Sequence, residues 1–150
     1  MPRLDNVRVG TWRDLRLLVD RIERSIDEEL RADWDIAIEW FDVLTALQRL
    51  DGIARPLDIA AELGVPASSI SRRLDRLEEE GWIARHRHTD VDKRAVDVEL
   101  TKSGRRLWRE MNVTYRRAVQ AHFATHLADE DIASFRSLID ALAEPGDDVD

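Results

Sequence analysis

The chain has 150 residues, of which 43% are hydrophobic and 36% are charged, with a formal net charge of −8 and no cysteine. This length suits a single domain that buries its own core, and the missing cysteines exclude disulfides, thiolate zinc sites and thiol redox switches. The N-terminus lacks the apolar run of a signal peptide, and no stretch reaches the roughly 18 apolar residues of a membrane span. We therefore expect a cytoplasmic protein.

Net acidity argues at first sight against a nucleic-acid partner, but the charge is unevenly distributed. Residues 66–106 carry ten Arg or Lys against eight Asp or Glu, whereas the rest of the chain carries 13 against 23. A local patch in residues 66–106 can therefore bind DNA while the acidic remainder weakens loose, non-specific binding.

The first predicted helix covers residues 11–34. Thr11 is placed to cap its N-terminus, and Asp14 follows three residues later at the positive end of the helix dipole. Apolar residues then recur at helical spacing as far as Leu30. A stripe this long is difficult to cover within a small domain, so we expect part of the helix to pack against a second subunit. Packing wholly on its own core is the alternative.

A helix-turn-helix is predicted between residues 57 and 80. A helix over residues 36–50 precedes it and ends at Asp51-Gly52. A short helix over residues 57–63 follows, with Gly64 in a good position for a left-handed C-terminal residue. After a tight turn, a longer helix covers residues 67–80. A short helix, a turn containing Gly and a longer helix are the pattern of a helix-turn-helix.

Alternating apolar and polar residues predict a β-hairpin over residues 82–100, because a period of two is that of strands. Thr101 is expected to cap a helix that continues to about Leu127. A last helix begins at Ala128 and is expected to turn its apolar side chains inward: Ile132, Phe135, Leu138, Ile139 and Leu142. Residues 144–150 form an acidic tail.

The predicted fold is mainly α with a small β-hairpin, in one unit that spans residues 1–150. A winged helix-turn-helix covers residues 36–101, with residues 82–100 as its wing. Long N- and C-terminal helices over residues 11–34 and 102–142 flank it, and we expect them to form a dimer interface.

Three segments of the chain resemble the MarR family of winged-helix transcriptional regulators. Residues 69–83 resemble the family's recognition helix and its exit into the wing. Residues 90–104 are similar to the family's wing motif, an acid-and-arginine tip that ends in Leu-Thr-x-x-Gly, and residues 40–47 resemble its second helix. The chain departs from the pattern at Pro66, where a capping Ser or Asp is common, so the start of the recognition helix is open by a residue or two.

The resemblance implies a homodimer whose first and last helices interlock. Each subunit would place the 67–80 helix in a major groove and the 89–94 wing tip in a minor groove of a pseudo-palindromic DNA operator. The two long helices at opposite ends of the chain suggest the same arrangement independently. The resemblance also places an effector pocket between the dimerisation and DNA-binding parts.

The candidate DNA-binding residues of the 67–80 helix are hydroxyl and arginine side chains. Early hydroxyls can donate to phosphates where the helix dipole also favours anions, and arginines have the reach for major-groove base edges. The set is Ser68, Ser69, Ser71, Arg72, Arg73 and Arg76. Arg72 shares a face with the first two serines, whereas Arg76 is equally able to pair with Glu79 or Glu80 on its own helix.

The candidate DNA-binding residues of the wing are Arg87, Asp92, Lys93 and Arg94. Asp92 and Arg94 lie on the same side of an extended chain, so the carboxylate can orient the guanidinium toward a narrow minor groove. Lys93 then points toward a phosphate. The alternative is that Asp92 and Arg94 form only a surface ion pair, worth under ~1 kcal/mol.

Trp34, Trp40 and Arg85 are the candidate ligand-binding residues. The two tryptophans flank the junction of the first two helices, where an aromatic effector can stack, and plain packing is the alternative. Trp82 and Trp108 fit apolar stripes and are expected in the core.

Two pairs of histidines have spacings that a metal can use. They are His86 with His88, and His122 with His126. The pairs lie on different elements and no cysteine is present, so solvated or DNA-facing histidines explain them better, and we expect no metal or cofactor.

Together these features predict a homodimeric, sequence-specific DNA-binding regulator. We expect a repressor that a small ligand, for example an aromatic compound, releases from its operator. A winged-helix module that binds protein instead of DNA is the alternative, in keeping with the acidic total. An enzyme is disfavoured, because no Ser/His/Asp set, phosphate loop or HExxH motif is present.

Overall fold

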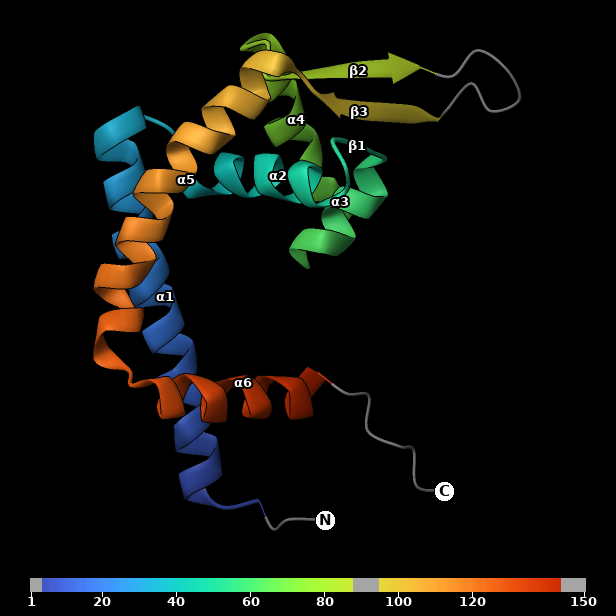
Figure 1. Cartoon of the computed structure of the whole chain (residues 1–150). Helices are drawn as coiled ribbons and strands as arrows, with labels where there is room; N and C mark the ends of the chain where they lie inside the picture. Colours follow the sequence, from blue (N-terminus) through green and yellow to red (C-terminus); the bar gives the residue numbers. More distant parts are fainter. Residues whose placement is uncertain (1–3, 88–94, 144–150) are drawn as a thin grey trace, which may run out of the picture.

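The computed structural model describes residues 4–87 and 95–143, and its elements follow the predicted order (Figure 1). The helices and strands are α1 (Asn6–Trp34), α2 (Ile38–Arg49), β1 (Ile53–Ala54), α3 (Pro56–Leu63), α4 (Ile70–Glu79), β2 (Ile83–Arg87), β3 (Val96–Leu100), α5 (Lys102–His122) and α6 (Asp129–Ala143), with short 3-10 turns at Ala67–Ser69 and Ala124–His126. In this part of the chain no helix is both long and apolar enough to cross a membrane.

The small sheet has three antiparallel strands in the order β1-β3-β2 instead of the two that the sequence predicts. β2 pairs with β3 from Ile83 opposite Leu100 to Arg87 opposite Val96, as the hairpin requires. β1 has only two residues, too few to show alternation in the sequence. Its place depends on a turn in which Asp51 and Gly52 both have positive φ. The Gly52 carbonyl accepts a hydrogen bond from the main-chain N–H of Leu100 at 2.8 Å.

The head, which consists of α2, α3, α4 and the sheet, has a core of its own. Burying each of its large apolar side chains contributes roughly 1.5–3 kcal/mol. Fully buried members of this core are Val43, Leu44, Leu47, Ile59, Ile70, Leu77 and Val98.

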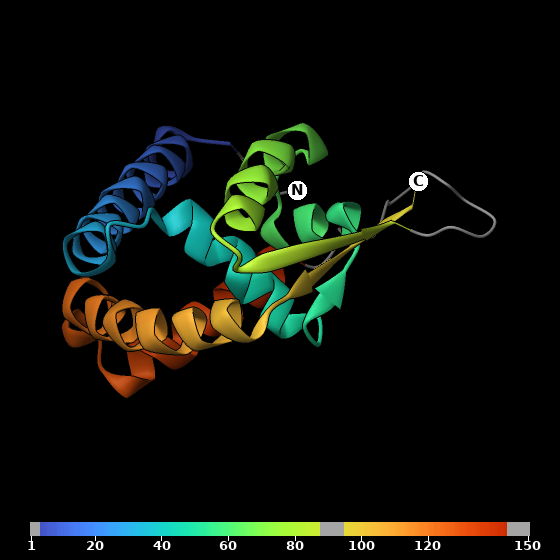
Figure 2. The same cartoon turned by 90° about the horizontal axis from the view of Figure 1, so that it is seen from above.

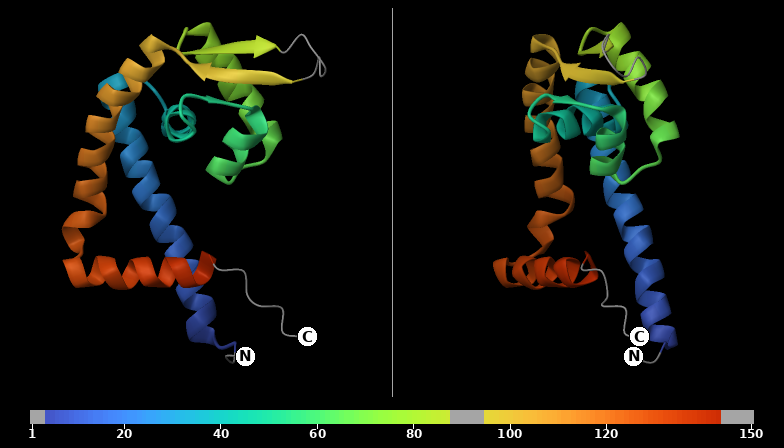
Figure 3. Two further views of the ribbon diagram at one scale, coloured as in Figure 1. Left: turned by 45° about the vertical axis from the view of Figure 1, so that its right-hand side comes forward. Right: turned by 90° about the vertical axis from the view of Figure 1, so that its right-hand side faces the viewer.

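The stalk, which consists of α1 and α5 lying side by side, has a second core (Figures 1 and 3). Leu30 of α1 and Met111 of α5 are fully buried there. Phe41 of α2 reaches into this core, and its ring centroid lies 4.9 Å from that of Tyr115. The second core therefore joins the stalk to the head.

Two predicted helix ends are wrong. α1 begins at Asn6 because the Asp5 carboxylate accepts from the main-chain N–H of Arg8 at 2.9 Å, and Thr11 is an interior residue whose hydroxyl donates to the Val7 carbonyl. α5 ends at His122 and not at Leu127, because Phe123 leaves the helical conformation and packs edge-on against Phe135 of α6. Contact between distant elements sets this second end, and local spacing does not reveal it.

Apolar side chains at both ends of the chain remain uncovered. α6 has no buried residue within the described chain, and Leu138 and Leu142 are 62% and 80% exposed. The predicted inward face of α6 is therefore not buried by this chain. On α1 the apolar stripe is buried at Ile26 and Leu30, but Val19 is 52% exposed. The structure thus leaves much of the first half of α1 and most of α6 open.

Candidate nucleic-acid interface

The turn between α3 and α4 has the predicted glycine. Gly64 has a φ of 63°, in the left-handed region that favours glycine, and the next main-chain N–H, that of Val65, donates to the Ala60 carbonyl at 3.1 Å. This closure ends α3 and directs the chain into the 3-10 turn before α4. The first turn of the predicted 67–80 helix is therefore 3-10, and its α-helical part begins at Ile70.

α4 turns one face into the head and the opposite face outward. Ile70, Leu74 and Leu77 are buried at helical spacing. Ser68 and Arg72 lie opposite this face and are exposed. Figures 2 and 3 show α4 on the side of the head away from α5. Burial of three aliphatic side chains therefore fixes which side chains α4 offers to a partner.

The hydroxyls near the start of α4 differ in their contacts. Ser68 and Ser71 are exposed, whereas the Ser69 hydroxyl donates to the Pro66 carbonyl at 2.8 Å. The Ser69 oxygen keeps only its acceptor capacity for another partner. Ser68 and Ser71 are the hydroxyls that remain placed to donate to a phosphate.

The three arginines of α4 have different environments. Arg72 is exposed and has no ion pair with another described residue. Arg73 is only 19% exposed and lies 3.7 Å from the Glu39 carboxylate of α2. Arg76 pairs with Glu79 and Glu80 at 3.5 and 3.7 Å. Of the three, Arg72 is therefore the one most available to DNA.

Arg76 also contacts an aromatic ring. Its guanidinium carbon lies 5.7 Å from the ring centroid of Trp40, within the range of a cation–π interaction. The pairing with acids of its own helix, expected as an alternative to DNA contact, is therefore present in the structure.

The wing is attached to α4 by Arg85 of β2. Its guanidinium lies 2.7 Å from the Asp75 carboxylate and 4.0 Å from that of Glu78, and its main-chain N–H donates to Glu78 at 3.1 Å. Two acids that would repel a phosphate are thereby paired. Arg87 at the end of β2 is exposed. The predicted wing-tip residues Asp92, Lys93 and Arg94 lie outside the described residues, as does the 144–150 tail.

A second junction fixes α4 to the start of α5. Thr101 caps α5 as predicted, accepting from the Gly104 main-chain N–H at 3.1 Å. Its hydroxyl and that of Ser103 both donate to the Gly81 carbonyl, at 2.7 and 2.9 Å. A Cβ on Gly104 would lie 2.0 Å from the carbonyl oxygen of Trp82. This close approach of two main chains requires glycine at residue 104.

The predicted ligand-binding residues lie on three elements and have separate partners. Trp34 is half-buried, and its indole N–H donates to the Thr114 hydroxyl at 3.1 Å. Trp40 packs between the two cores, and Arg85 is engaged with α4 as described. Trp82 and Trp108 are half-buried and pack against both cores.

Two of the histidines pair with acids. His86 Nε2 lies 2.7 Å from Glu99 across the sheet, and His122 Nε2 lies 2.6 Å from Glu29 across the stalk. His88, the predicted mate of His86, lies outside the described residues. Within the described ranges, no group of three or more His, Asp or Glu side chains is placed to hold a metal ion.

A cavity of about 400 Å³ lies where the stalk meets the head, and the sequence did not predict it. Its walls come from α1, α2, α5 and α6 and are mostly apolar, with two carboxyls, Glu23 and Asp42. Burial raises the pKa of Asp42 to about 6, and the charge of Glu23 adds to this effect. The sequence feature that indicates this site is Asp42 itself, an acid between Phe41 and Val43 inside the apolar run of α2.

The sequence is similar to that of MarR family regulators. The model of the MarR family matches residues 34–95, which include α2, α3, α4 and β2. The transcriptional regulator PecS of Dickeya dadantii is 32% identical over 98 residues, which cover 64% of this chain but only 56% of PecS. The transcriptional repressor MdtR of Bacillus subtilis is 26% identical over 96% of this chain and 90% of its own length.

A solved structure shares the whole arrangement of elements. Sco3205, a MarR family transcriptional regulator from Streptomyces coelicolor crystallised in complex with DNA, superimposes with a TM-score of 0.84. The alignment covers 97% of both chains at 23% identity. This likeness confirms the winged helix-turn-helix fold between long terminal helices.

Proposed function

This chain belongs to the MarR family, and on that premise we propose that it is a homodimeric transcription regulator that reads a pseudo-palindromic DNA operator. The observation that carries the proposal is the outward face of α4. That face places exposed Arg72 beside exposed hydroxyls, opposite the buried leucines. Such a helix fits a major groove, and an Arg bidentate to guanine is the most common specific contact.

The dimer in this proposal uses the two ends of the chain, over the predicted residues 11–34 and 102–142. Support comes from the apolar side chains that this chain leaves uncovered, such as Val9 and Leu17 on α1 and Leu138 and Leu142 on α6. A second copy that buries these stripes removes apolar surface from water and sets the spacing of the two α4 helices.

The regulator is proposed to be a cytoplasmic repressor that a small ligand releases from its operator. The likeness to MdtR, a transcriptional repressor that aligns with 96% of this chain, supports the sign of regulation. The cavity between stalk and head supports a ligand response, because a molecule bound there touches both parts. The family is one of transcription regulators, which argues against an enzyme.

The test is a mobility-shift titration with promoter DNA from beside the protein's own gene, at fixed salt. Arg72→Ala is expected to cost about 1–3 kcal/mol of binding and to relax the base preference. Arg94→Ala tests the wing tip, which lies outside the described residues. Arg116→Ala removes an exposed positive charge from the stalk and serves as the control. Unchanged affinity in both Arg72→Ala and Arg94→Ala contradicts the proposal and leaves the protein-binding alternative.

A further inference from the structure

The cavity between stalk and head is unusual in the kind of polar groups that it contains. Apolar side chains such as Ile22, Ile26 and Phe123 supply most of its wall. Apart from the Tyr115 hydroxyl, the ionisable groups that line it are the carboxyls of Glu23 on the stalk and Asp42 on the head. No basic side chain lines it. The wall of the cavity is therefore apolar except where Glu23, Asp42 and the Tyr115 hydroxyl line it.

Neither carboxyl has a hydrogen bond or an ion pair with another residue in ranges 4–87 and 95–143. The groups that act on Asp42 are Glu23 of α1, Arg73 of α4 and Glu39 on its own helix, and of these only Arg73 favours the ionised form. Tyr115 of α5 lines the same cavity, and burial first, then the charges of Asp42 and Glu23, raise the pKa of its hydroxyl. The two acids thus repel each other without a positive partner between them.

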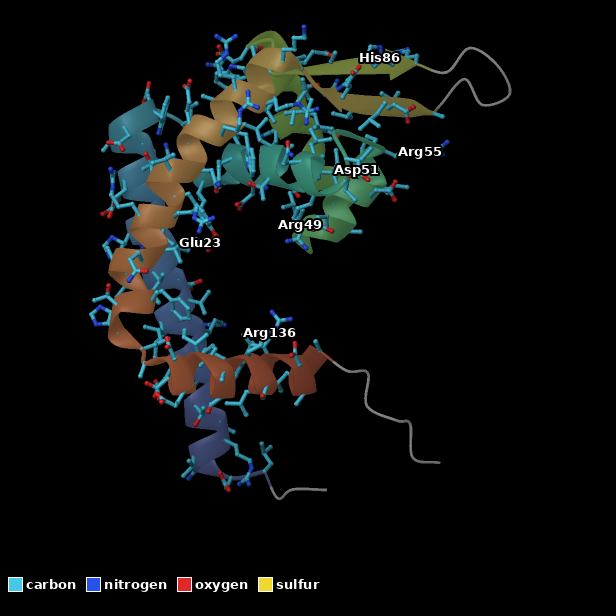
Figure 4. The ribbon with its side chains drawn as sticks, in the orientation of Figure 1. Glu23, Arg49, Asp51, Arg55, His86 and Arg136 are labelled. Carbon is cyan, nitrogen blue, oxygen red and sulfur yellow. The ribbon has the colours of Figure 1, made fainter. Side chains whose placement is uncertain are left out.

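The hollow beside this cavity on the α2 side is also acidic, whereas the hollow toward α6 has Arg21, His122 and His126 in its wall. The hollow between α1 and α2 shares Glu23 with the cavity and is lined by Asp20, Asp27 and Glu39 against one base, Arg24. Asp27 is paired with Arg31 and Glu39 lies 3.7 Å from Arg73, so Glu23 and Asp20 supply most of the uncompensated negative charge there. Figure 4 shows the Glu23 side chain on the concave side of the molecule, below the head. Such a surface raises the local concentration of cations and lowers that of anions.

We propose that the cavity binds a small lipophilic cation, an organic ammonium with an apolar body of one or two rings, whose charge lies between Glu23 and Asp42. This inference rests on the proposed ligand response and names its chemical class. A volume of about 400 Å³ accommodates such a molecule. Apolar contact drives binding, and the two carboxyls select positive charge over neutral and negative analogues.

The position of the site also explains how ligand binding affects the DNA-binding helix, α4. Glu23 belongs to the stalk and Asp42 to the head, so a cation that pairs with both fixes one part relative to the other. Arg73 of α4 acts on Asp42 and lies 3.7 Å from Glu39, one turn before Asp42 on α2. Binding therefore changes the charge that faces α4 as well as the angle of the head.

The experiment compares three probes that share a naphthyl ring and differ in charge, on the full-length protein by titration calorimetry at pH 7.5. They are 1-naphthylmethylamine, 1-naphthalenemethanol and 1-naphthoic acid. The amine is expected to bind at least about tenfold more tightly than the alcohol, and the acid more weakly than either. Lowering the pH to 5 is expected to reduce the preference for the amine, because Asp42 then takes up a proton.

Substitutions of the two carboxyls test whether they cause the preference for the amine. Glu23→Gln with Asp42→Asn is expected to abolish the preference for the amine while the alcohol still binds. Glu28→Gln removes one exposed charge from the same helix and is expected to leave the preference unchanged. Glu23→Gln alone provides a second measurement if the double variant does not fold.

Equal binding of amine and alcohol, tighter binding of the acid, or a preference that survives the double substitution overturns the inference. Absence of binding by all three probes, as expected if a second subunit fills the cavity, overturns it as well. The calorimetry contains no DNA, so these results are independent of operator binding. A wild-type protein that shifts operator DNA but ignores charge on the probe retains the proposed DNA-binding function and loses this inference alone.

Discussion

Replacing Asp42 by Asn is expected to stabilise the folded protein above pH 6. Burial first, and the neighbouring Glu23 second, raise the pKa of Asp42 from 3.8 to about 6. At about 1.4 kcal/mol for each pH unit, this shift corresponds to at most about 3 kcal/mol of destabilisation when the group is ionised. Because the side chain is only partly buried, solvent screening reduces the expected gain of the variant to about 1–2 kcal/mol.

The pH dependence has a definite sign. The folded state binds the Asp42 proton more tightly than the unfolded state, so stability falls as the pH rises between the two pKa values. The cost is absent below about pH 3.8, grows up to about pH 6 and stays constant above it. The advantage of Asp42→Asn is therefore expected at pH 8 and nearly absent at pH 4.

Urea unfolding at pH 4 and pH 8 measures this difference. Protein concentration is held fixed, because a dimer gains stability from association. Asp14→Asn, an exposed substitution on α1, is the control for the loss of one charge. A stability difference for Asp42→Asn that is the same at both pH values, or a loss of stability at pH 8, refutes the reasoning.

Three further predictions concern the scaffold. Gly104→Ala is expected to lower the free energy of unfolding in urea by about 2–3 kcal/mol, because the new Cβ meets a main-chain carbonyl at 2.0 Å. The control Gly10→Ala has open space around it and is expected to raise the free energy of unfolding by up to about 1 kcal/mol. Trp34→Phe is expected to lose about 1 kcal/mol with its hydrogen bond to α5, whereas exposed Trp12→Phe changes little. Leu138→Glu is expected to shift the protein toward monomer in sedimentation velocity, and an unchanged sedimentation coefficient contradicts the proposed use of α6 in the dimer.

Several features of the site follow from short-range patterns in the sequence. Gly64 ends α3 and Thr101 caps α5, as predicted, because caps and turns depend on residues three or four apart. The same applies to the strands of the hairpin, whose alternation is visible in the chain itself. Helical spacing predicts Arg72 on the outer face of α4, and the structure exposes it there.

Other features depend on which elements meet. Arg73, a predicted DNA-binding residue, pairs with Glu39 of α2. Arg85, a predicted ligand-binding residue, pairs with Asp75 of α4. Periodicity cannot reveal such partners, because they lie far away along the sequence.

The sequence by itself determined the winged helix-turn-helix, its order of elements and the outward face of α4, because helix caps, turns and apolar periods act between near neighbours. Only the tertiary structure decided the third strand, the end of α5 and the acidic cavity. Glu23 and Asp42 lie 19 residues apart on separate helices, and they line one cavity because packing of Phe41 into the stalk core brings α2 against α1 and α5.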